Sequence, residues 1–226
     1  MITIGLLTLS KYEDMAKKAI DSIVCNENYR IVIVDNGQKL DEDVEGVKII
    51  RPQKNVGIAP GWNMIVLDAI ENGSEEIVIL NDDLILHPEC IDLLIQDIRE
   101  GYDIITGYMI HNHEVFPDVK IEPRFINGMH FSCFAMNRNT LFTVGKFDEG
   151  YAPCYVEDTD YYYRLMKTDL KYGCDRWAKF THKRFLDRQE PWVKESHKKN
   201  RAYFSKKHGE HPKKTFRIMS EGRKQA

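Results

Sequence analysis

The sequence predicts an α/β fold in which helices flank a mainly parallel central sheet. Short apolar runs read as strands, segments with helical spacing lie between them, and the runs end abruptly in Asp, Asn and Gly. This alternation favours parallel pairing, because each helix returns the chain to the start of the next strand. With 226 residues and 42% hydrophobic content, the chain is long enough for one sizeable core.

The first half of the chain alternates between strands and helices. The expected strands are residues 2–9, 30–34, 47–50 and 77–80. A helix over residues 11–24 follows the first strand, because Ser10 and Glu13 have the spacing of a capping box. Pro60 suits the first turn of a second helix, and Gly73 suits its C-terminal end.

The second half continues the pattern and ends in a basic segment. The expected elements are a helix from 88 to about 100, strands at 103–106 and 131–136, a short strand ending at 180–181, and helices at 158–167 and 192–207. Residues 109–130 lack periodicity and are expected to form a loop over the open edge of the sheet. We therefore divide the chain into a main domain, 1–185, and a basic C-terminal extension, 186–226.

Composition limits which cellular compartment and which partners are expected. The five cysteines are scattered and include no C-x-x-C pair, which favours a reducing, cytoplasmic setting, in a host cytoplasm or peripherally at an inner membrane. No run has the length of a transmembrane helix, and the apolar start reads as a first strand. Residues 179–226 carry 15 Lys/Arg against 5 Asp/Glu, whereas residues 1–178 carry 17 against 30. The extension is therefore chemically different from the body.

An acidic turn, Asn81-Asp82-Asp83, directly follows the fourth expected strand. Ligands of open parallel sheets bind beyond the carboxyl ends of the strands, so these side chains stand where chemistry is usually placed. Carboxylates suit Mg²⁺ or Mn²⁺, which would neutralise a departing diphosphate. A solvated turn is the structural alternative.

Five segments are informative because they occur in a particular order along the chain. They are 31–37 (IVIVDNG), 55–63 (NVGIAPGWN), 79–83 (ILNDD), 144–149 (VGKFDE) and 156–160 (VEDTD). Together they resemble the motifs of inverting family-2 glycosyltransferases with the GT-A (Rossmann-like) fold, in the branch that includes rhamnosyltransferase-like enzymes. The resemblance covers residues 2–185. It implies a nucleotide-sugar donor, which we expect to be UDP-linked, and a divalent metal.

The resemblance also assigns roles to particular residues. The residues expected to bind the nucleotide or donor sugar are Thr8, Ser10, Asp35, Asn36, Asn55, Gly57, Asn63, Asn81 and Asp82. Asn81 replaces the first acid of the family's D-x-D motif, which leaves Asp83 as the expected metal ligand, with His182 as a second. Plain turns remain the alternative for Asp35-Asn36-Gly37 and for the glycines.

The segment Glu157-Asp158 is expected to supply the catalytic carboxylate. Inverting transfer needs one base to take the proton of the acceptor hydroxyl, and Asp158 is the choice, with Glu157 beside it. Asp160 is expected to contact the acceptor. Capping of the following helix is the alternative role for Asp158. His111, His113 and His130 have no better claim to a site than His182.

Paired cations recur in the extension, and aromatic residues lie between them. The pairs are Lys183-Arg184, Lys198-Lys199, Lys206-Lys207 and Lys213-Lys214. Such a surface suits phosphate backbones or an anionic membrane face, and a solvated helix is the alternative. Lys198 and Lys199 are the expected acceptor contacts. Two acceptors stay open: a hydroxymethylated DNA base, as in phage DNA modification, or a cell-surface or lipid-linked glycan.

Two other functional classes compete with a transferase. A noncatalytic module that binds a nucleotide-sugar or nucleic acid is compatible with Asn81, but the intact Glu157-Asp158 pair argues against it. A nucleotidyltransferase would need a glycine-rich N-terminal loop with a cation for the triphosphate. Phosphate-loop and dinucleotide-binding glycine motifs are also absent, which argues against an ATPase or a dehydrogenase.

Overall fold

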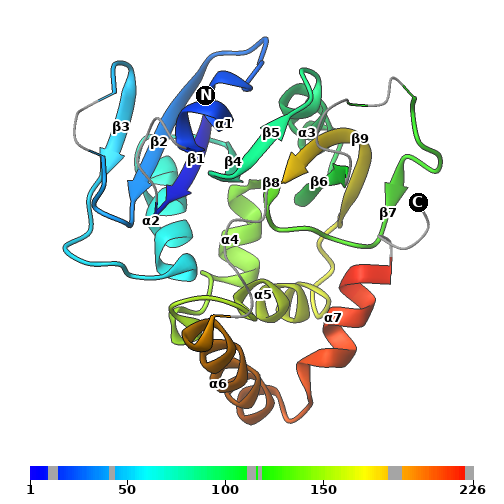
Figure 1. Cartoon of the computed structure of the whole chain (residues 1–226). Coiled ribbons are helices and arrows are strands. Elements are labelled where there is room, and N and C mark those ends of the chain that lie inside the picture. The colour runs from blue at the N-terminus through cyan, green and yellow to red at the C-terminus, as the bar shows by residue number, and fades with distance from the viewer. Residues whose placement is uncertain (10–14, 41–43, 111–115, 117–118, 183–189, 222–226) are drawn as a thin grey trace.

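A computed structural model describes residues 1–9, 15–40, 44–110, 116, 119–182 and 190–221, and its architecture is α/β as predicted (Figure 1). The strands are β1 Ile2–Thr8, β2 Tyr29–Asp35, β3 Val47–Ile50, β4 Glu76–Asn81, β5 Leu84–Leu86, β6 Ile104–Ile110, β7 Phe125–Ile126, β8 Cys133–Asn137 and β9 Tyr172–His182. The helices are α1 Lys17–Asp21, α2 Ile58–Glu71, α3 Cys90–Arg99, α4 Arg138–Val144, α5 Glu157–Leu165, α6 Pro191–His208 and α7 Pro212–Glu221, with a 3₁₀ turn at Glu149–Tyr151.

The strands form one mixed sheet in the order β3-β2-β1-β4-β8-β6-β9-β5, and β7 also pairs with β9. The half built from β3, β2, β1 and β4 is parallel, as expected. In the other half, β8 runs antiparallel to both β4 and β6, and β5 and β7 run antiparallel to β9. The pair of β6 and β9 is parallel, so the predicted fold class is confirmed, with a sheet that is partly antiparallel. No helix is described between β6 and β8, and strands joined without a crossover helix pair antiparallel.

Several elements differ from the sequence prediction. The segment 109–130 is not simply a loop, because β6 continues to Ile110 and Phe125–Ile126 pairs with β9. The last strand is much longer than predicted, and β5, α4 and α7 were not expected. The first described helix covers only Lys17–Asp21; its predicted capping box, Ser10 and Glu13, lies outside the described residues.

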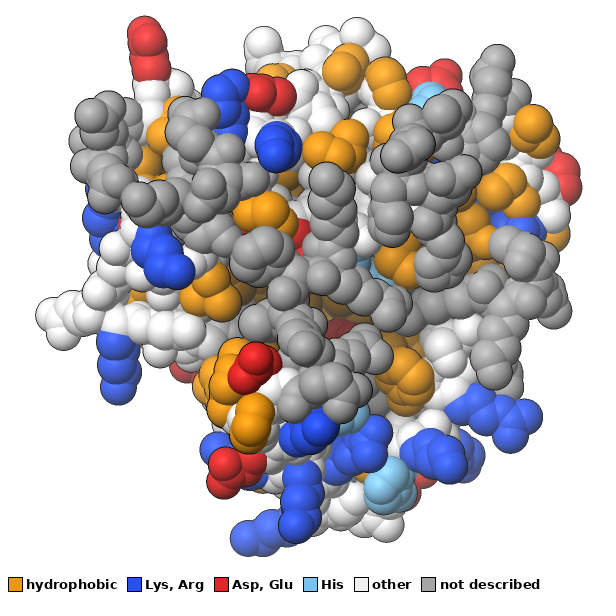
Figure 2. Space-filling model, viewed as in Figure 1, with side chains coloured by type: hydrophobic (Ala, Val, Ile, Leu, Met, Phe, Trp, Pro, Cys, Tyr) orange, Lys and Arg blue, Asp and Glu red, His pale blue; other side chains and the backbone are white. Residues whose placement is uncertain are grey.

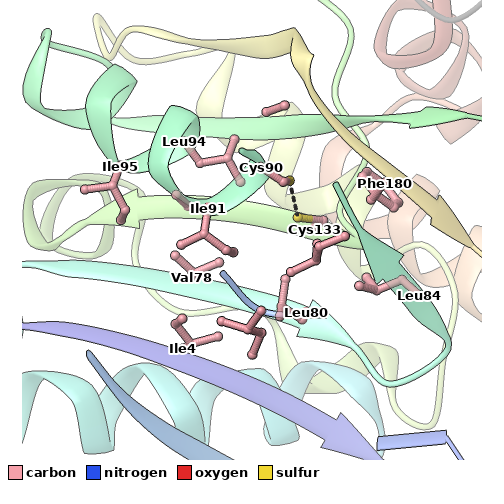
Figure 3. Packing of buried hydrophobic residues seen from close by; sticks show 14 of the residues in the cluster. Ile4, Val78, Leu80, Leu84, Cys90, Ile91, Leu94, Ile95, Cys133 and Phe180 are labelled. Carbon is pink, nitrogen blue, oxygen red and sulfur yellow. Dashed lines mark hydrogen bonds between the residues drawn. The ribbon is translucent and has the colours of Figure 1, made fainter. Parts of the chain in front are cut away.

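The helices cover both faces of the sheet and bury two separate apolar layers. Successive side chains of a strand point to opposite faces, so along β4 Val78 and Leu80 join the layer under α1 and α3. Ile77 and Ile79 join the layer under α2 and α5. Figure 3 shows the first layer, in which the sulfur atoms of Cys90 and Cys133 lie 3.9 Å apart. The cysteines at 25, 90, 133, 154 and 174 are all free thiols.

The C-terminal helices α6 and α7 lie beside α5, below the sheet in Figure 1. Figure 2 shows Lys and Arg side chains gathered over this lower part of the molecule. The predicted domain boundary falls within residues 183–189, which also contain Lys183 and Arg184 and lie outside the described part. Across the described ranges, no helix combines the length and apolar character needed to cross a membrane.

Candidate active site

A cavity of about 990 Å³ opens beyond the carboxyl ends of β1 and β4. Its lining comes from the strand ends, the start of α5 and the two C-terminal helices. The predicted site residues that line it are Asn36, Asn55, Gly57, Asn81, Asp82, Asp83, Glu157, Asp158 and His182. Segments far apart in sequence therefore meet at one cavity whose size is typical of small-molecule sites.

Strand register places Thr8 beside the acidic turn. Leu7 pairs with Asn81 across parallel strands, so the next residue of each strand lies at the same edge. The Thr8 hydroxyl donates a hydrogen bond to Asp82 Oδ2 at 2.5 Å. Burial raises the pKa of Asp82 to about 6, and the adjacent Asp83 also raises it, against the lowering effect of the Thr8 hydrogen bond. Asp82 is thus held in place at the cavity wall.

Asp83 meets His182 at the same edge. The pairing of Leu84 with His182 brings the end of β9 beside the turn, and His182 Nε2 lies 2.7 Å from Asp83 Oδ1. These side chains are only 11% and 10% exposed. Within the described ranges, no three His, Cys, Asp or Glu residues are grouped to hold a metal ion. Asp83 and His182 supply two candidate ligands, so a bound diphosphate would have to supply further oxygens.

The two polar residues of the predicted nucleoside turn are both buried, and only one of them lines the cavity. Asp35 is 1% exposed and does not line the cavity. Its carboxylate accepts hydrogen bonds from the backbone amides of Lys39 and Leu40, at 3.0 and 3.1 Å, and so holds the turn. Asn36 lines the cavity, and its side chain bonds the backbone of Val56 and Gly57. Asn36 therefore ties the first turn to the start of α2.

The loop before α2 approaches another part of the chain closely. The Asn55 side chain accepts a hydrogen bond from the Gly57 amide at 2.9 Å. Gly57 has φ +94°, and a Cβ at this position would lie 2.8 Å from the Pro153 carbonyl oxygen. The Ile58 amide donates to that same oxygen at 2.9 Å. Glycine is needed here both for its backbone conformation and for the close approach.

Asn63 does not reach the cavity that it was expected to serve. It is 2% exposed, donates to the Phe147 carbonyl and to Glu149, and accepts from the Phe147 amide, each at 2.9 Å. Two of the segments that resemble family motifs are thus joined by this one amide. Its role in the structure is to fasten α2 to residues 147–149.

The segment that carries Glu157 and Asp158 begins with strained backbone. Tyr155 and Val156 have φ of 71° and 76°, a region that a β-branched residue rarely adopts. Val156 is the N-cap of α5, so the alternative in which Asp158 caps the helix is not the observed arrangement. The Asp158 carboxylate lines the cavity and accepts hydrogen bonds from the Thr159 amide and hydroxyl, at 2.6 and 3.1 Å.

Glu157 is buried beside Asp158, with 4% exposure, and its Oε2 has no hydrogen-bond partner among the described residues. Burial, together with the negative charge of Asp158, raises the pKa of Glu157 well above its usual value. The folded environment therefore favours the protonated form of Glu157 more than water does.

Asp160 is fully buried and outside the cavity lining. Burial alone would raise its pKa, but Arg164, Lys207 and His208 lower it below the usual value. The three basic groups lie 2.7 to 2.8 Å from its carboxylate. Asp160 therefore fastens the end of α6 to α5, rather than standing where an acceptor could reach it.

The C-terminal helices form a wall of the cavity, which the sequence prediction missed. The lining residues are Trp192, Val193, Lys194, His197 and Arg201 from α6, His211 just before α7, and Pro212, Lys213 and Phe216 from α7. Lys198 lines a neighbouring cleft, while Lys199 lines neither space. The sequence did contain a signal for the helix α7. Its first residue is a proline, and Thr215 and Met219, both buried, lie one turn apart.

Asn200 connects this wall to the strained segment. Its side-chain amide donates to the carbonyls of Tyr151, Cys154 and Tyr155, at 2.5, 2.9 and 2.9 Å. Ser196 also donates to the Cys154 carbonyl, at 2.8 Å. The helix therefore supports the backbone that presents Glu157 and Asp158.

Some of the remaining polar and aromatic residues lie outside the described part of the chain, and others line the cavity. Ser10, His111 and His113 lie outside the described residues. His130 lines the cavity and packs edge-on against His182, with ring centroids 6.0 Å apart. Lys39 and Trp62 also line the cavity, although the sequence prediction assigned neither of them a role in the site.

Comparison with known proteins accounts for four of the five ordered segments, since the fifth, 156–160, lies beyond the family match. The model of the glycosyl transferase family 2 matches residues 6–152. No curated protein sequence matches the chain. The fold is similar to that of S. aureus TarS 1-349, with a TM-score of 0.58 and 12% identity over 80% of this chain and 60% of that chain.

Two further structures have the same fold. TarS 1-349 in complex with UDP gives a TM-score of 0.61 and 10% identity, over 97% of this chain and 70% of that one. GalNAc-T7 with UDP, GalNAc and Mn²⁺ gives 0.65 and 14%, over 80% and 43%. The chain thus spans well under two thirds of some of these relatives. Because the family match covers more than half of the sequence, the chain belongs to glycosyl transferase family 2.

Proposed function

We propose that this chain is an inverting glycosyltransferase that moves a sugar from a nucleoside diphosphate donor, expected to be UDP-linked, to an acceptor hydroxyl. The observation that carries the proposal is that one cavity gathers the Asp83–His182 pair and Asp158, although Asp83 precedes Asp158 by 75 residues and His182 by 99. Diphosphate binding and proton abstraction both have a candidate group there. The UDP bound in two of the similar structures supports the choice of donor.

The donor would lie along the strand ends. Asn36, Asn55 and the backbone at Gly57 border the part of the cavity next to the nucleoside turn, and Asp82 and Asp83 border the part next to β4. Asp83 and His182 would hold a divalent cation, Mn²⁺ or Mg²⁺, which would neutralise charge on the diphosphate when bound. Mn²⁺ accompanies UDP in GalNAc-T7, which supports this assignment.

Asp158 would act as the general base. As the acceptor oxygen attacks the anomeric carbon, its proton passes to the Asp158 carboxylate, the new carbon–oxygen bond forms, and the bond to the diphosphate oxygen breaks on the opposite face. The two hydrogen bonds from Thr159 fix the carboxylate. Burial favours the neutral form of Glu157, which would limit the negative charge beside the base.

The identity of the acceptor is the open part of this proposal. A glycan of the cell surface or linked to a lipid, and a hydroxymethylated base in DNA, both remain candidates for the hydroxyl. A noncatalytic nucleotide-sugar-binding module is the other functional class, since Asn81 stands where an acid is usual in the family motif.

Donor hydrolysis and transfer separate these classes. We expect turnover of one donor from a panel of UDP-, GDP- and dTDP-sugars with Mn²⁺, and its loss in Asp158→Asn. Donor binding without turnover in the wild-type protein, with or without candidate acceptors, would instead identify a binding module. Asp169→Asn removes an exposed carboxylate outside the cavity lining and serves as the matched control.

A further inference from the structure

The helix α6 has a structural face and a separate cationic face. The structural face buries Val193, Ser196, Asn200 and Phe204. The end of the helix is fastened by Lys207, which pairs with Asp148 and Asp160 at 2.7 and 2.8 Å. These contacts account for the position of the helix without the remaining cations.

The cationic face lines a cleft of about 410 Å³ beside the start of α7. The cleft residues are Lys194, His197, Lys198, Arg201, Ala202, Ser205 and His211. Four of these, Lys194, His197, Arg201 and His211, also line the large cavity. The cleft therefore adjoins the cavity into which Asp158 faces.

Within the described part of the chain, the Lys and Arg side chains of this face are not neutralised by neighbouring acids. No Asp or Glu lines the cleft. Among the residues that the structure describes, Lys194, Lys198 and Arg201 form no ion pair, and neither does Lys213 on the cavity wall. This contrasts with Lys207 on the same helix. Unpaired cations that converge on a concave surface are suited to an anion, and guanidinium groups bind phosphate through two parallel hydrogen bonds.

Two exposed aromatic rings stand on the same wall. Trp192 is 46% exposed and Phe216 is 47% exposed, and both line the large cavity. Rings of this size are usually buried, so their position at a cavity wall indicates a surface for a flat or apolar ligand face, such as that of a sugar ring.

We propose that α6 and α7 form an acceptor subsite that binds a phosphate or a similar anionic group carried by the acceptor. The anionic group would occupy the cleft at Lys194 and Arg201, while the acceptor hydroxyl reaches Asp158. The inference rests on the proposed transferase function, because it identifies the class of acceptor for that site.

The charge distribution favours a compact anionic group over duplex DNA. Residues 1–178 carry 17 Lys/Arg against 30 Asp/Glu, so the body would repel an extended polyanion. The large cavity itself presents Asp82, Asp83, Glu157 and Asp158. A single phosphate-bearing chain that enters along the helices would avoid this acidic surface.

The test measures binding of inorganic tripolyphosphate by isothermal titration calorimetry, with EDTA present so that no metal links the probe to Asp83. We expect the Lys194→Glu/Arg201→Glu variant to bind the probe at least about tenfold more weakly than wild type, because two charge-assisted contacts become repulsive. Lys206→Glu is the matched control, since Lys206 is exposed on the same helix and lines neither space. If charge reversal prevents folding, the Lys194→Gln/Arg201→Gln variant is used in its place, and thermal melting checks that this variant is folded.

Three results would overturn the subsite: no probe binding by wild type, equal weakening in Lys206→Glu, or tighter binding of short duplex DNA with the same sensitivity to residues 194 and 201. UDP binding with Mn²⁺, measured separately, should be retained by the double variant. If wild type bound the probe but neither bound nor hydrolysed any donor, the transferase proposal would fail while the anion site remained.

Discussion

The two walls of the cavity differ in charge and in construction. The wall built from strand ends and the start of α5 presents Asp82, Asp83, Glu157 and Asp158, whereas the helical wall presents Lys194, Arg201 and Lys213. Opposite charges can neutralise one another by direct pairing, yet among the described residues Lys194, Arg201 and Lys213 form no ion pair, whereas Lys207, His208 and Lys214 do. The separation indicates that each wall serves a different part of a reaction.

The walls are also positioned by different forces. Parallel strand register brings Thr8, Asp82 and Asp83 to one edge, so this wall follows from backbone pairing. The helical wall depends on a few side-chain contacts, chiefly those of Asn200 and of Asp160. The first wall should therefore tolerate substitution without moving, while the second should be sensitive to single changes.

The largest expected effect concerns the base on the acidic wall. Asp158→Asn should lower the rate of sugar transfer by about 10²–10⁴-fold, the usual contribution of a positioned general base. UDP binding should be unchanged, because Asp158 is not among the residues proposed to bind the nucleotide. Steady-state kinetics and calorimetry measure the two effects. A fall in UDP affinity with an unchanged rate would move the role of Asp158 from chemistry to binding.

A second test addresses the proposed metal pair. Asp83→Ala and His182→Ala should each weaken Mn²⁺-dependent UDP binding by at least about tenfold, the lower limit for loss of a group that supports a metal site. The double variant should be little worse than either single one if the two side chains act as a unit. Calorimetry with and without EDTA checks this. Additive losses would show that the two residues act on UDP independently.

A third change should break the link between the walls. Asn200→Ala leaves the carbonyls of Tyr151, Cys154 and Tyr155 without their donor, which should lower the free energy of unfolding by about 1–3 kcal/mol. Because those carbonyls precede Asp158, the transfer rate should fall as well. Urea unfolding measures the first effect, and Lys199→Ala, at an exposed neighbour, is the control. An unchanged rate in a destabilised protein would show that the wall only supports the fold.

The smallest expected effect is a pH dependence due to Glu157. Its pKa in the folded state is raised above 4.5, so the folded state holds the proton more tightly than the unfolded state. The stability that this provides is complete below the unfolded pKa and is lost as pH rises through the folded value. The Glu157→Gln variant has no carboxyl at this position, so its stability does not fall with pH for this reason.

The difference in unfolding free energy between Glu157→Gln and wild type should therefore grow with pH, by at most about 1.4 kcal/mol per pH unit. Urea unfolding at several pH values measures it, and comparing the two proteins cancels the contributions of Asp82 and Asp160. A constant difference across the pH range would mean that the Glu157 carboxyl is ionised in the folded protein.

The sequence indicated most strands and helices of the first half because their signals are local. Pro60 lies in the first turn of α2, and Gly73, with φ +74°, follows its end as predicted. Strands as short as β5 and β7 escaped prediction because two or three residues carry no measurable periodicity. The helix α7 was not predicted because its many Lys and Arg residues obscure the four-residue spacing of Thr215 and Met219, which are buried.

Site residues were predictable where position along a strand sets the role, and not where a distant partner does. Asn81, Asp82 and Asp83 follow a strand that the sequence reveals, and they line the cavity. Asn63 and Asp160 have the same polar character, but their partners lie 84 and 47 residues away, at Phe147 and Lys207. Side-chain type alone does not distinguish a buried polar contact from a ligand contact.

By itself, the sequence determined the α/β class, the order of five family motifs and the acidic turn after β4, because periodicity and turn chemistry are encoded in neighbouring residues. Only the tertiary structure decided that the basic segment is a wall of the cavity, that β8 runs antiparallel in the sheet, and that Asp83 meets His182. Each of these depends on packing between residues distant along the chain, where burial and hydrogen bonding outweigh local preference.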